Sequence, residues 1–146
     1  MTTSQKHSQN TRSVDRAASV GLIDAARTAS ADIEINVAIA VTNFGGHLTA
    51  LQTMDHTPFL AIKVAIDKAW TAVSYHVATH IWSDVIKNPE VQHLAHIPGL
   101  SAVAGGYPII EDGIVIGGIG VSGGTWEQDK RIAEAALTAL GFEFTT

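Results

Sequence analysis

Histidine is the residue type in this sequence most able to do chemistry, with seven among 146 residues. Two pairs have the spacing of metal or haem ligands, since residues three or four apart share a face of a helix: His76 with His80, and His93 with His96. Imidazole binds zinc and haem iron and exchanges protons near neutral pH. The commoner role of such residues is that of a polar group at a helix end or in a loop. His93 and His96 are the better candidates because they precede a glycine-bearing segment at 98–106.

A lysine and two acids form a second candidate set. Lys68 lies in a predicted helix, and we expect it either to pair with Glu127 or Asp129 or to bind a substrate carbonyl or carboxylate. The alternative is a lysine whose stem lies along the rim of the helix or seals a subunit contact. With a histidine added, the set predicts acid–base catalysis without a cofactor, by a lyase, isomerase or hydrolase of a small organic substrate. The catalytic residues of this hypothesis are Lys68, His96, Glu127 and Asp129.

Glycines flank the segments that would hold a ligand. The glycine pair in VSGGTWEQD precedes a predicted helix, whose free N–H groups can bind an anion such as a carboxylate or a haem propionate. The acids in the first turn of that helix can satisfy the same dipole, so plain capping is an equal alternative. A second glycine pair precedes a tyrosine that could donate a hydrogen bond into a pocket or simply pack in the core. The predicted ligand-binding residues are His93, Gly105, Gly106, Tyr107, Gly123 and Gly124.

Composition excludes several classes of function. Lys and Arg number 9 against 14 Asp and Glu, for a net charge of -5, and the basic residues are scattered, which argues against nucleic-acid binding. The chain has no cysteine and therefore no disulfide, thiolate metal site or cysteine nucleophile. The polar start and the lack of an apolar run of about 20 residues predict a soluble cytoplasmic protein that does not span a membrane. Charged residues make up 16% of the chain, against a usual share of about 25%, so we expect a homo-oligomer that covers apolar surface.

The hydropathy pattern predicts one domain at residues 13–146 after a disordered tail at residues 1–12. Ser13 is the expected N-cap of a first helix with a face of small residues. A β-hairpin follows, with a strand that ends near Val41, a glycine-bearing turn and the partner strand LTALQTM. A second helix is expected to have Thr57 as its N-cap and Pro58 as its first residue.

One apolar stripe of the second helix is predicted to face the core, formed by Phe59, Ile62, Ile66, Ala69, Val73 and Val77. HIWSDVIK is expected to form a short helix, and EVQHLAHIPGL a loop with a helical turn. Asp112 and Gly113 predict the turn of a second hairpin. Thr125 with Gln128 predicts a capping box for a last helix that ends at Gly141. The expected fold is α+β, an antiparallel sheet of about four to five strands flanked by helices on one face or both.

Gly117, Gly118 and Gly120 lie close together in the strand after the second turn. Glycine weakens a strand because it has no side chain to pack, so three together predict that a helix or a ligand approaches the backbone closely. A ligand-binding role for this strand requires the second alternative, in which a molecule other than protein occupies the space beside it.

Three segments carry a resemblance to a known family: VTNFGGHLTALQTMD at 41–55, DKAWTAV at 67–73, and PGLSAVAGGYPIIEDGIVIGGIGVSGGTWEQDKRIAEAAL at 98–137. They are similar to small proteins named for GlcG and for the haem-binding protein HbpS, a family that includes the C-terminal domain of PduO-type cobalamin adenosyltransferases. The resemblance covers nearly the whole chain after the tail. Asn43 stands where the family commonly carries aspartate, so no role of a carboxylate is carried over to that position.

The resemblance implies a profilin-like α/β sandwich that assembles into oligomers, and a link in some members to haem or corrinoids. No axial ligand of haem iron can be carried over to a particular residue. The leading hypothesis is a small oligomeric protein that binds haem, a related tetrapyrrole or another small apolar molecule. The cofactor-independent enzyme is the alternative, and a purely structural subunit is a third.

Overall fold

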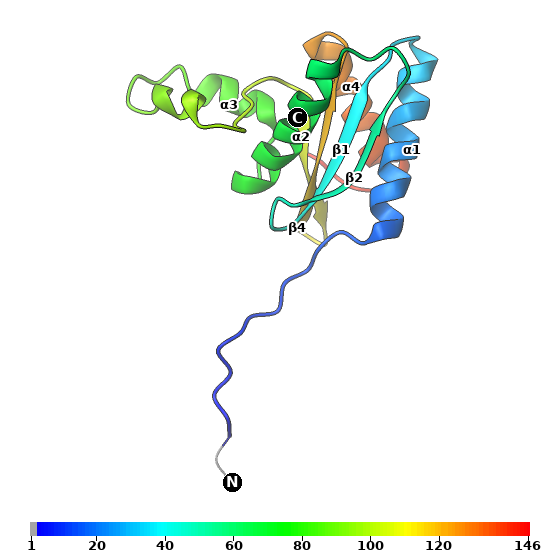
Figure 1. Ribbon diagram of the computed structural model, residues 1–146. Helices are drawn as coiled ribbons and strands as arrows, with labels where there is room; N and C mark the ends of the chain where they lie inside the picture. Colours follow the sequence, from blue (N-terminus) through cyan, green and yellow to red (C-terminus); the bar gives the residue numbers. More distant parts are fainter. Residues whose placement is uncertain (1–2) are drawn as a thin grey trace.

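A computed structural model describes residues 3–146, and residues 1–2 lie outside the described part. Within this range the helices and strands follow the predicted order of helix, hairpin, helix, short helix, hairpin and helix (Figure 1). The elements are α1 Arg16–Asp32, β1 Ala38–Asn43, β2 Leu48–Thr53, α2 Phe59–Tyr75, α3 Thr79–Val85, the 3-10 helix η1 Gln92–His96, β3 Gly106–Glu111, β4 Ile114–Ser122 and α4 Trp126–Ala139.

The strands form one antiparallel sheet in the order β2-β1-β4-β3, in which β1 and β4 join the two hairpins. Helices α1 and α4 pack side by side on one face, and α2 covers the other (Figure 1). The predicted α+β fold is confirmed, with helices on both faces. Helix α3 and η1 project to one side as an arm (Figure 1). In residues 3–146 no helix has both the length and the apolar character that a membrane crossing requires.

Residues 3–15, before α1, have no regular secondary structure. Asp15, and not the predicted Ser13, caps α1, because its side chain accepts a hydrogen bond from the N–H of Ala18 at 2.8 Å. The Ser13 hydroxyl accepts instead from the N–H of Phe44 at 3.0 Å, which ties this segment to the first hairpin. Disorder of residues 1–12 stays a prediction.

Helix α2 begins one residue later than expected. Pro58 is its N-cap, and the Pro58 carbonyl accepts from the N–H of Ala61 at 2.9 Å. The hydroxyl of Thr57, predicted as the cap, has no hydrogen-bond partner among the described residues. By contrast, the capping box of Thr125 and Gln128 at the start of α4 is confirmed.

Positive φ angles mark the turns that the sequence predicts. Asp112 and Gly113 have φ angles of 52° and 74°, as the two central residues of a type I′ hairpin turn require. Gly141 has a φ of 80° directly after α4 and ends that helix, as expected.

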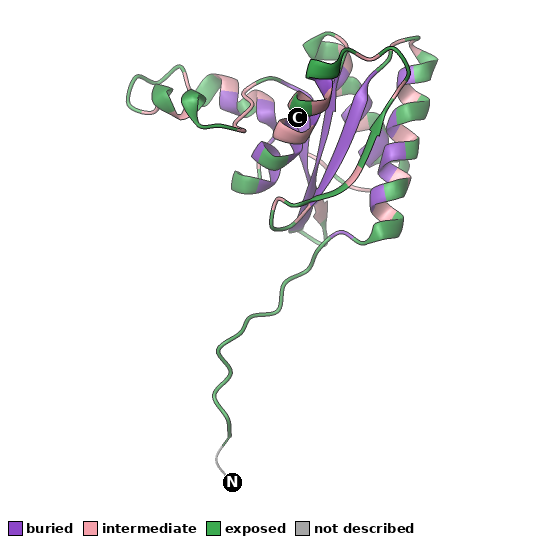
Figure 2. Ribbon diagram, viewed as in Figure 1, coloured by how far each residue is buried: buried purple, intermediate pink, exposed green. Residues whose placement is uncertain are grey.

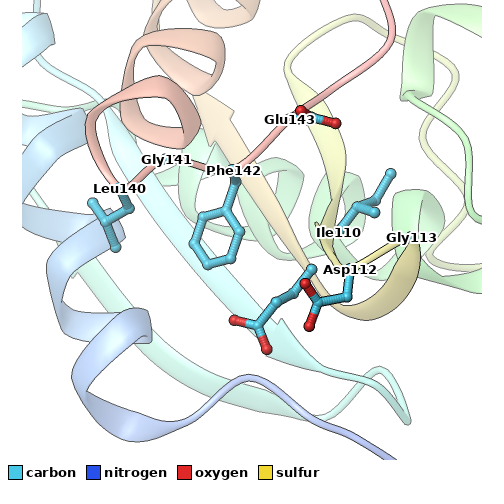
Figure 3. A pocket seen from close by; sticks show the side chains of 8 residues that line it. Ile110, Asp112, Gly113, Leu140, Gly141, Phe142 and Glu143 are labelled. Atoms are coloured by element: carbon cyan, nitrogen blue, oxygen red, sulfur yellow. The ribbon is translucent and has the colours of Figure 1, made fainter.

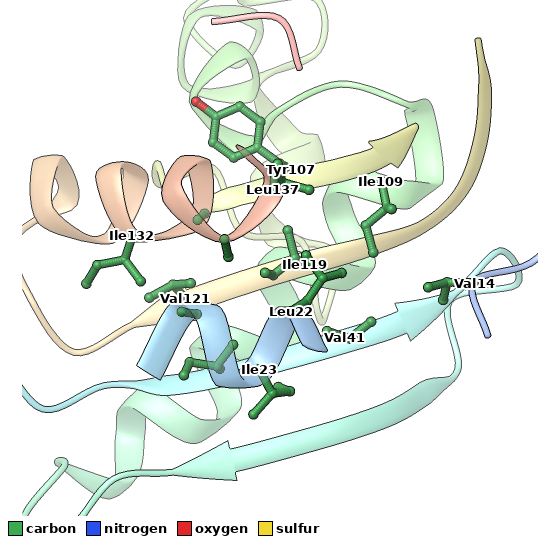
Figure 4. Packing of buried hydrophobic residues seen from close by; sticks show 14 of the residues in the cluster. Val14, Leu22, Ile23, Val41, Tyr107, Ile109, Ile119, Val121, Ile132 and Leu137 are labelled. Atoms are coloured by element: carbon green, nitrogen blue, oxygen red, sulfur yellow. The ribbon is translucent and has the colours of Figure 1, made fainter. Parts of the chain in front are cut away.

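The main hydrophobic core lies between the sheet and the helix pair α1 and α4. Leu22 of α1, Ile132 of α4 and Ile119 of β4 are all buried there (Figure 4). Full burial of such a side chain stabilises a fold by about 1.5–3 kcal/mol. Figure 2 shows the same distribution, with buried residues along the central strands and exposed residues on the outer sides of the helices.

Helix α2 contacts the sheet mainly through its small residues. Ala69 and Val73 of the predicted apolar stripe are buried as expected, whereas the large stripe residues at the start of the helix are not. Phe59 is 88% exposed, and Ile62 and Ile66 are only partly buried. The buried residues of the helix are Ala61, Ala65, Lys68, Ala69, Thr71, Ala72 and Val73. The large apolar side chains at the start of α2 therefore point away from the sheet.

The glycines of β4 explain this arrangement. A Cβ on Gly118 would lie 2.3 Å from the carbonyl oxygen of Ala69, and one on Gly120 would lie 2.0 Å from that of Ala65. The backbone of α2 thus lies directly on the strand, at distances that exclude any side chain between them. A helix, and not a ligand, approaches these glycines, so the expectation that a ligand occupies this space is wrong.

Candidate functional site

Lys68 of α2 and Asp129 of α4 form a buried ion pair, although their helices lie on opposite faces of the sheet. Nζ of Lys68 is 2.9 Å from Oδ2 of Asp129, and it donates to the carbonyl oxygen of Val121 at 2.8 Å. The two side chains are 1% and 4% exposed. Oδ1 of Asp129 accepts from the N–H of Gly124 at 2.9 Å. Of the two acids considered for Lys68, Asp129 is the partner.

Burial perturbs both members of this pair. It lowers the pKa of Lys68 and raises the pKa of Asp129, because removing either group from water disfavours its charged form more than the partner favours it. The pair links the two helical layers past the end of β4. Because both groups are sealed from solvent, the arrangement supports a clamp between layers and not an acid–base centre open to a substrate.

The other two residues of the predicted catalytic set lie elsewhere. Glu127 is exposed in the first turn of α4, and His96 is exposed in η1 on the arm. The five surface pockets considered below are lined by none of Lys68, His96, Glu127 and Asp129. The structure brings together Lys68 and Asp129 alone, so the convergence that the enzyme hypothesis requires is not found in residues 3–146.

The first predicted glycine pair packs against the protein itself. Gly105 has a φ of 121°, and a Cβ there would lie 2.9 Å from Nζ of Lys68. The N–H of Gly106 donates to the hydroxyl of Thr79 at 2.9 Å, which fastens β3 to the arm. Both glycines therefore allow close contact between backbone segments.

The predicted anion site at the start of α4 is already filled. Asp129 accepts from the N–H of Gly124, and a Cβ on Gly123 would lie 2.6 Å from the carbonyl oxygen of Asn36. Tyr107 is fully buried and donates to Glu134 at 2.8 Å, so its hydroxyl does not reach a pocket. Burial also raises the pKa of Tyr107.

The two histidine pairs have different surroundings. His76 is the C-cap of α2 whereas His80 lies in α3, so the expectation that they share one helix face is wrong. The ring of His80 lies 5.8 Å from that of Tyr107, and burial lowers the pKa of His80. His93 and His96 are exposed on η1 with their ring centroids 5.8 Å apart.

Three surface hollows share lining residues around His76, and together we call them the His76 groove. His76 lines hollows of about 280 Å³ and 380 Å³. Val77 and Ile81 connect the first of these to a third hollow of about 310 Å³. The walls are aliphatic and aromatic, with Trp70 and Trp82 among the largest side chains. No Asp, Glu, Lys or Arg lines the three hollows, so the imidazole is their one basic side chain.

The backbone of His76 has a left-handed conformation, with φ 61° and ψ 31°. This conformation costs a residue other than glycine about 1–2 kcal/mol. The ring is exposed, with its centroid 6.3 Å from that of Phe44. Strained residues cluster at functional sites. The sequence interpretation ranked His76 below the arm histidines, and no glycine or asparagine at this position signals the end of the helix.

Two further pockets lack an exposed imidazole. One, of about 390 Å³, lies between the second hairpin and the end of α4 and contains Glu111, Asp112 and Glu143 (Figure 3). Its carboxylates favour cations, and Arg12 already pairs with the first two. The other, of about 280 Å³, contains Trp126 and the partly buried His80.

Comparison with known proteins places these features in a family. The model of a family described as haem degrading protein HbpS-like matches residues 14–138. The corrinoid adenosyltransferase PduO of Salmonella typhimurium is 35% identical over 111 residues, which are 74% of this chain and 33% of that protein. The chain thus spans about a third of the length of PduO. An uncharacterized 15.0 kDa protein of Citrobacter freundii is 32% identical over 133 residues, covering 89% of this chain and 94% of that protein.

Solved structures show the same architecture. The crystal structure of a complex of PduOC with haem has a TM-score of 0.83 and 30% identity, and the match covers 92% of this chain and 99% of that chain. A double mutant of Streptomyces reticuli HbpS has a TM-score of 0.88 and 25% identity, over 97% of this chain and 96% of that chain. Since the family model also spans most of the domain, this chain belongs to the HbpS-like family.

Proposed function

We propose that this protein binds haem or a closely related tetrapyrrole in the His76 groove, with the imidazole of His76 as a ligand of the iron. The observation that carries the proposal is that an apolar groove with a single imidazole lies on a domain similar to one crystallised with haem. The predicted ligand residues on the arm and beside the glycines lie outside this groove.

The groove fits the chemistry of the group. A tetrapyrrole presents two broad apolar faces, which suit walls made of aliphatic and aromatic side chains. An exposed imidazole can ligate haem iron. No carboxylate lines the hollows, so none repels the propionates. Haem supplies a redox-active iron when bound, and the protein holds the macrocycle and sets the axial ligand.

Haem titration of the purified protein, followed by the Soret band, tests the proposal. We expect saturable binding by the wild type and at least tenfold weaker binding by His76→Ala. His93→Ala and His56→Ala are matched controls, because both histidines are exposed and lie outside the groove. Absence of a Soret band in the wild type would refute haem binding. Wild-type affinity in His76→Ala would refute the assigned ligand.

A substitution in the wall tests the groove separately from the ligand. Ile81 lines two of the hollows and is 38% exposed, so Ile81→Glu should leave the fold intact while it places a carboxylate against the macrocycle. We expect weaker haem binding with an unchanged circular dichroism spectrum. Unchanged binding would place haem elsewhere on the surface.

We also propose that the outward face of α2 binds a second copy of this chain. Phe59 and Leu60 are 88% and 66% exposed, next to two partly buried isoleucines. Contiguous apolar surface of this kind marks interaction sites. Lys63 and Asp67 neutralise each other on the same helix at 2.6 Å, so two copies can meet there without repulsion.

Light scattering after size-exclusion chromatography tests this second proposal. We expect an oligomer for the wild type and a smaller species for the Phe59→Asp variant. Val20→Asp is the control, because it makes a similar change at a 40% exposed position on α1. A monomeric wild type, or dissociation caused equally by Val20→Asp, would contradict the assignment.

A further inference from the structure

The arm carries two histidines that the proposed haem site leaves unused. His93 and His96 stand three residues apart in η1 and are both exposed. We infer that this pair forms a binding site for a divalent transition-metal ion of the copper, nickel and zinc class, separate from the His76 groove.

The geometry of a 3-10 helix aligns the two rings. Side chains at positions i and i+3 of such a helix lie one above the other. The ring centroids are 5.8 Å apart, and the ring planes are inclined by 29°. In a tetrahedral zinc site a histidine nitrogen lies about 2.0–2.1 Å from the metal, so the centroids of two rings on one ion are about 5 Å apart. The observed separation of 5.8 Å is slightly longer, and the exposed rings can turn to bring one nitrogen each to a common ion.

Backbone hydrogen bonds hold the turn of η1 that carries the two histidines. Leu94, between the two histidines, lines the third hollow of the His76 groove together with Tyr75 and Trp82, whereas neither histidine lines any of the three hollows. The N–H of Leu94 donates to the carbonyl of Val91 at 3.0 Å, and the N–H of Ile97 donates to the carbonyl of Leu94 at 3.0 Å. The histidines therefore project from a hydrogen-bonded turn. A chelating pair that is aligned in advance loses less conformational freedom on binding.

The two imidazole nitrogens determine which class of metal ion the site prefers. Calcium and magnesium prefer oxygen ligands, whereas imidazole suits zinc, copper and nickel. No group of three or more His, Cys, Asp and Glu side chains placed to hold an ion occurs in residues 3–146. The chain therefore supplies two ligands, and the other coordination positions are open to water or to a second molecule. Copper binds nitrogen sites most tightly among these ions, which makes Cu²⁺ the most sensitive probe.

Titration of the haem-free full chain with Cu²⁺, by calorimetry and by electron paramagnetic resonance, tests the inference. We expect a tight site with one ion per chain and hyperfine coupling to two imidazole nitrogens. His93→Ala and His96→Ala should each weaken this site at least tenfold. His47→Ala and His56→Ala, which change other exposed histidines, should leave it intact.

Two results would overturn the inference. One is wild-type Cu²⁺ affinity in the double variant His93→Ala/His96→Ala. The other is loss of affinity in one single variant but not in the other, since a chelate needs both rings. Circular dichroism checks that the variants fold. Haem titration of the double variant distinguishes the metal site from the proposed haem site, because loss of His93 and His96 should leave the Soret band as in the wild type.

Discussion

Replacing His76 by glycine should stabilise the protein and weaken the proposed binding of haem. The left-handed backbone of His76, with a φ of 61°, costs about 1–2 kcal/mol in a residue with a side chain, and glycine removes that cost. Glycine also makes the unfolded chain more flexible, which offsets about 0.4–1 kcal/mol of the gain. Since the ring is exposed, little packing is lost. The net gain in the free energy of unfolding is about 0.5–1 kcal/mol.

Two measurements on the same variant check this prediction. Urea unfolding without haem gives the free energy, and a gain of 1 kcal/mol raises Tm by about 2–4 °C in a domain of this size. Haem titration gives the affinity, which should fall at least tenfold. A residue whose replacement raises stability and lowers binding is retained for function rather than for folding.

His56→Gly is the matched control. His56 is also an exposed histidine with a positive φ, 65°, but it lies outside the groove. It should show the same gain in stability with wild-type haem binding. A His76→Gly variant that is less stable than the wild type would show that the ring packs in the fold. Wild-type haem affinity in that variant would remove His76 from the site.

Three further sets of substitutions test the fold around the site. Lys68→Met or Asp129→Leu alone should lower the free energy of unfolding by about 3–5 kcal/mol, because each leaves one buried charge without its partner. The double variant Lys68→Met/Asp129→Leu should recover most of this loss, and additive losses in urea unfolding would contradict the reasoning. Gly120→Ala places a methyl group 2.0 Å from the helix backbone and should lower the free energy of unfolding by more than about 3 kcal/mol. In the control Gly21→Ala the methyl group meets only a movable side chain, so the free energy of unfolding should change by less than about 1 kcal/mol. Equal Tm values for the two variants would refute the reasoning. Burial raises the pKa of Tyr107 above its ordinary 10.0, so its contribution to stability is present below pH 10 and is lost as the pH rises toward the folded-state pKa. Above pH 10 the free energy of unfolding of Tyr107→Phe should therefore fall less steeply with pH than that of the wild type, by about 1.4 kcal/mol per pH unit. The same pH dependence in both proteins would show that the phenol does not lose its proton on unfolding.

The predicted order of elements is confirmed because local chemistry marks each boundary. Asp112 and Gly113 adopt the positive φ angles of a hairpin turn, and Thr125 caps the helix that follows the sheet. These signals act over a few residues and need no knowledge of the tertiary structure. The N-caps at Ser13 and Thr57 are wrong by one or two residues, because a neighbouring residue takes the role in each case.

The sequence narrows the partner of Lys68 to Glu127 or Asp129 but does not decide between the two. Residues two apart on an α-helix point about 200° apart, so Glu127 and Asp129 could not both face one lysine. Which of them turns inward depends on how α4 rotates against the sheet, and its side chains at Ile132 and Leu137 set that rotation through packing. The choice is therefore a property of the assembled fold.

The position of His76 was not predictable from periodicity. The four-residue spacing from His76 to His80 implies one continuous helix, but α2 ends at Tyr75 and a separate helix begins at Thr79. Helices commonly end at a glycine in the left-handed conformation, and here a histidine takes that place. The residue at this exception to the local rule lines two of the three hollows of the groove.

The orientation of α2 was predictable only from two segments taken together. Hydropathy assigns the largest apolar side chains to the core, but Gly118 and Gly120 leave room there only for small residues. The face of α2 that contacts these glycines carries alanines four residues apart, at Ala61, Ala65 and Ala69. The size of the side chains, and not their hydropathy, therefore determines which face of α2 is buried. The large side chains are consequently displaced outward, where Trp70 of the same helix lines the His76 groove. The glycines thus contribute to the proposed binding surface from a distance, because they force the large apolar side chains of α2 to the outside of the protein.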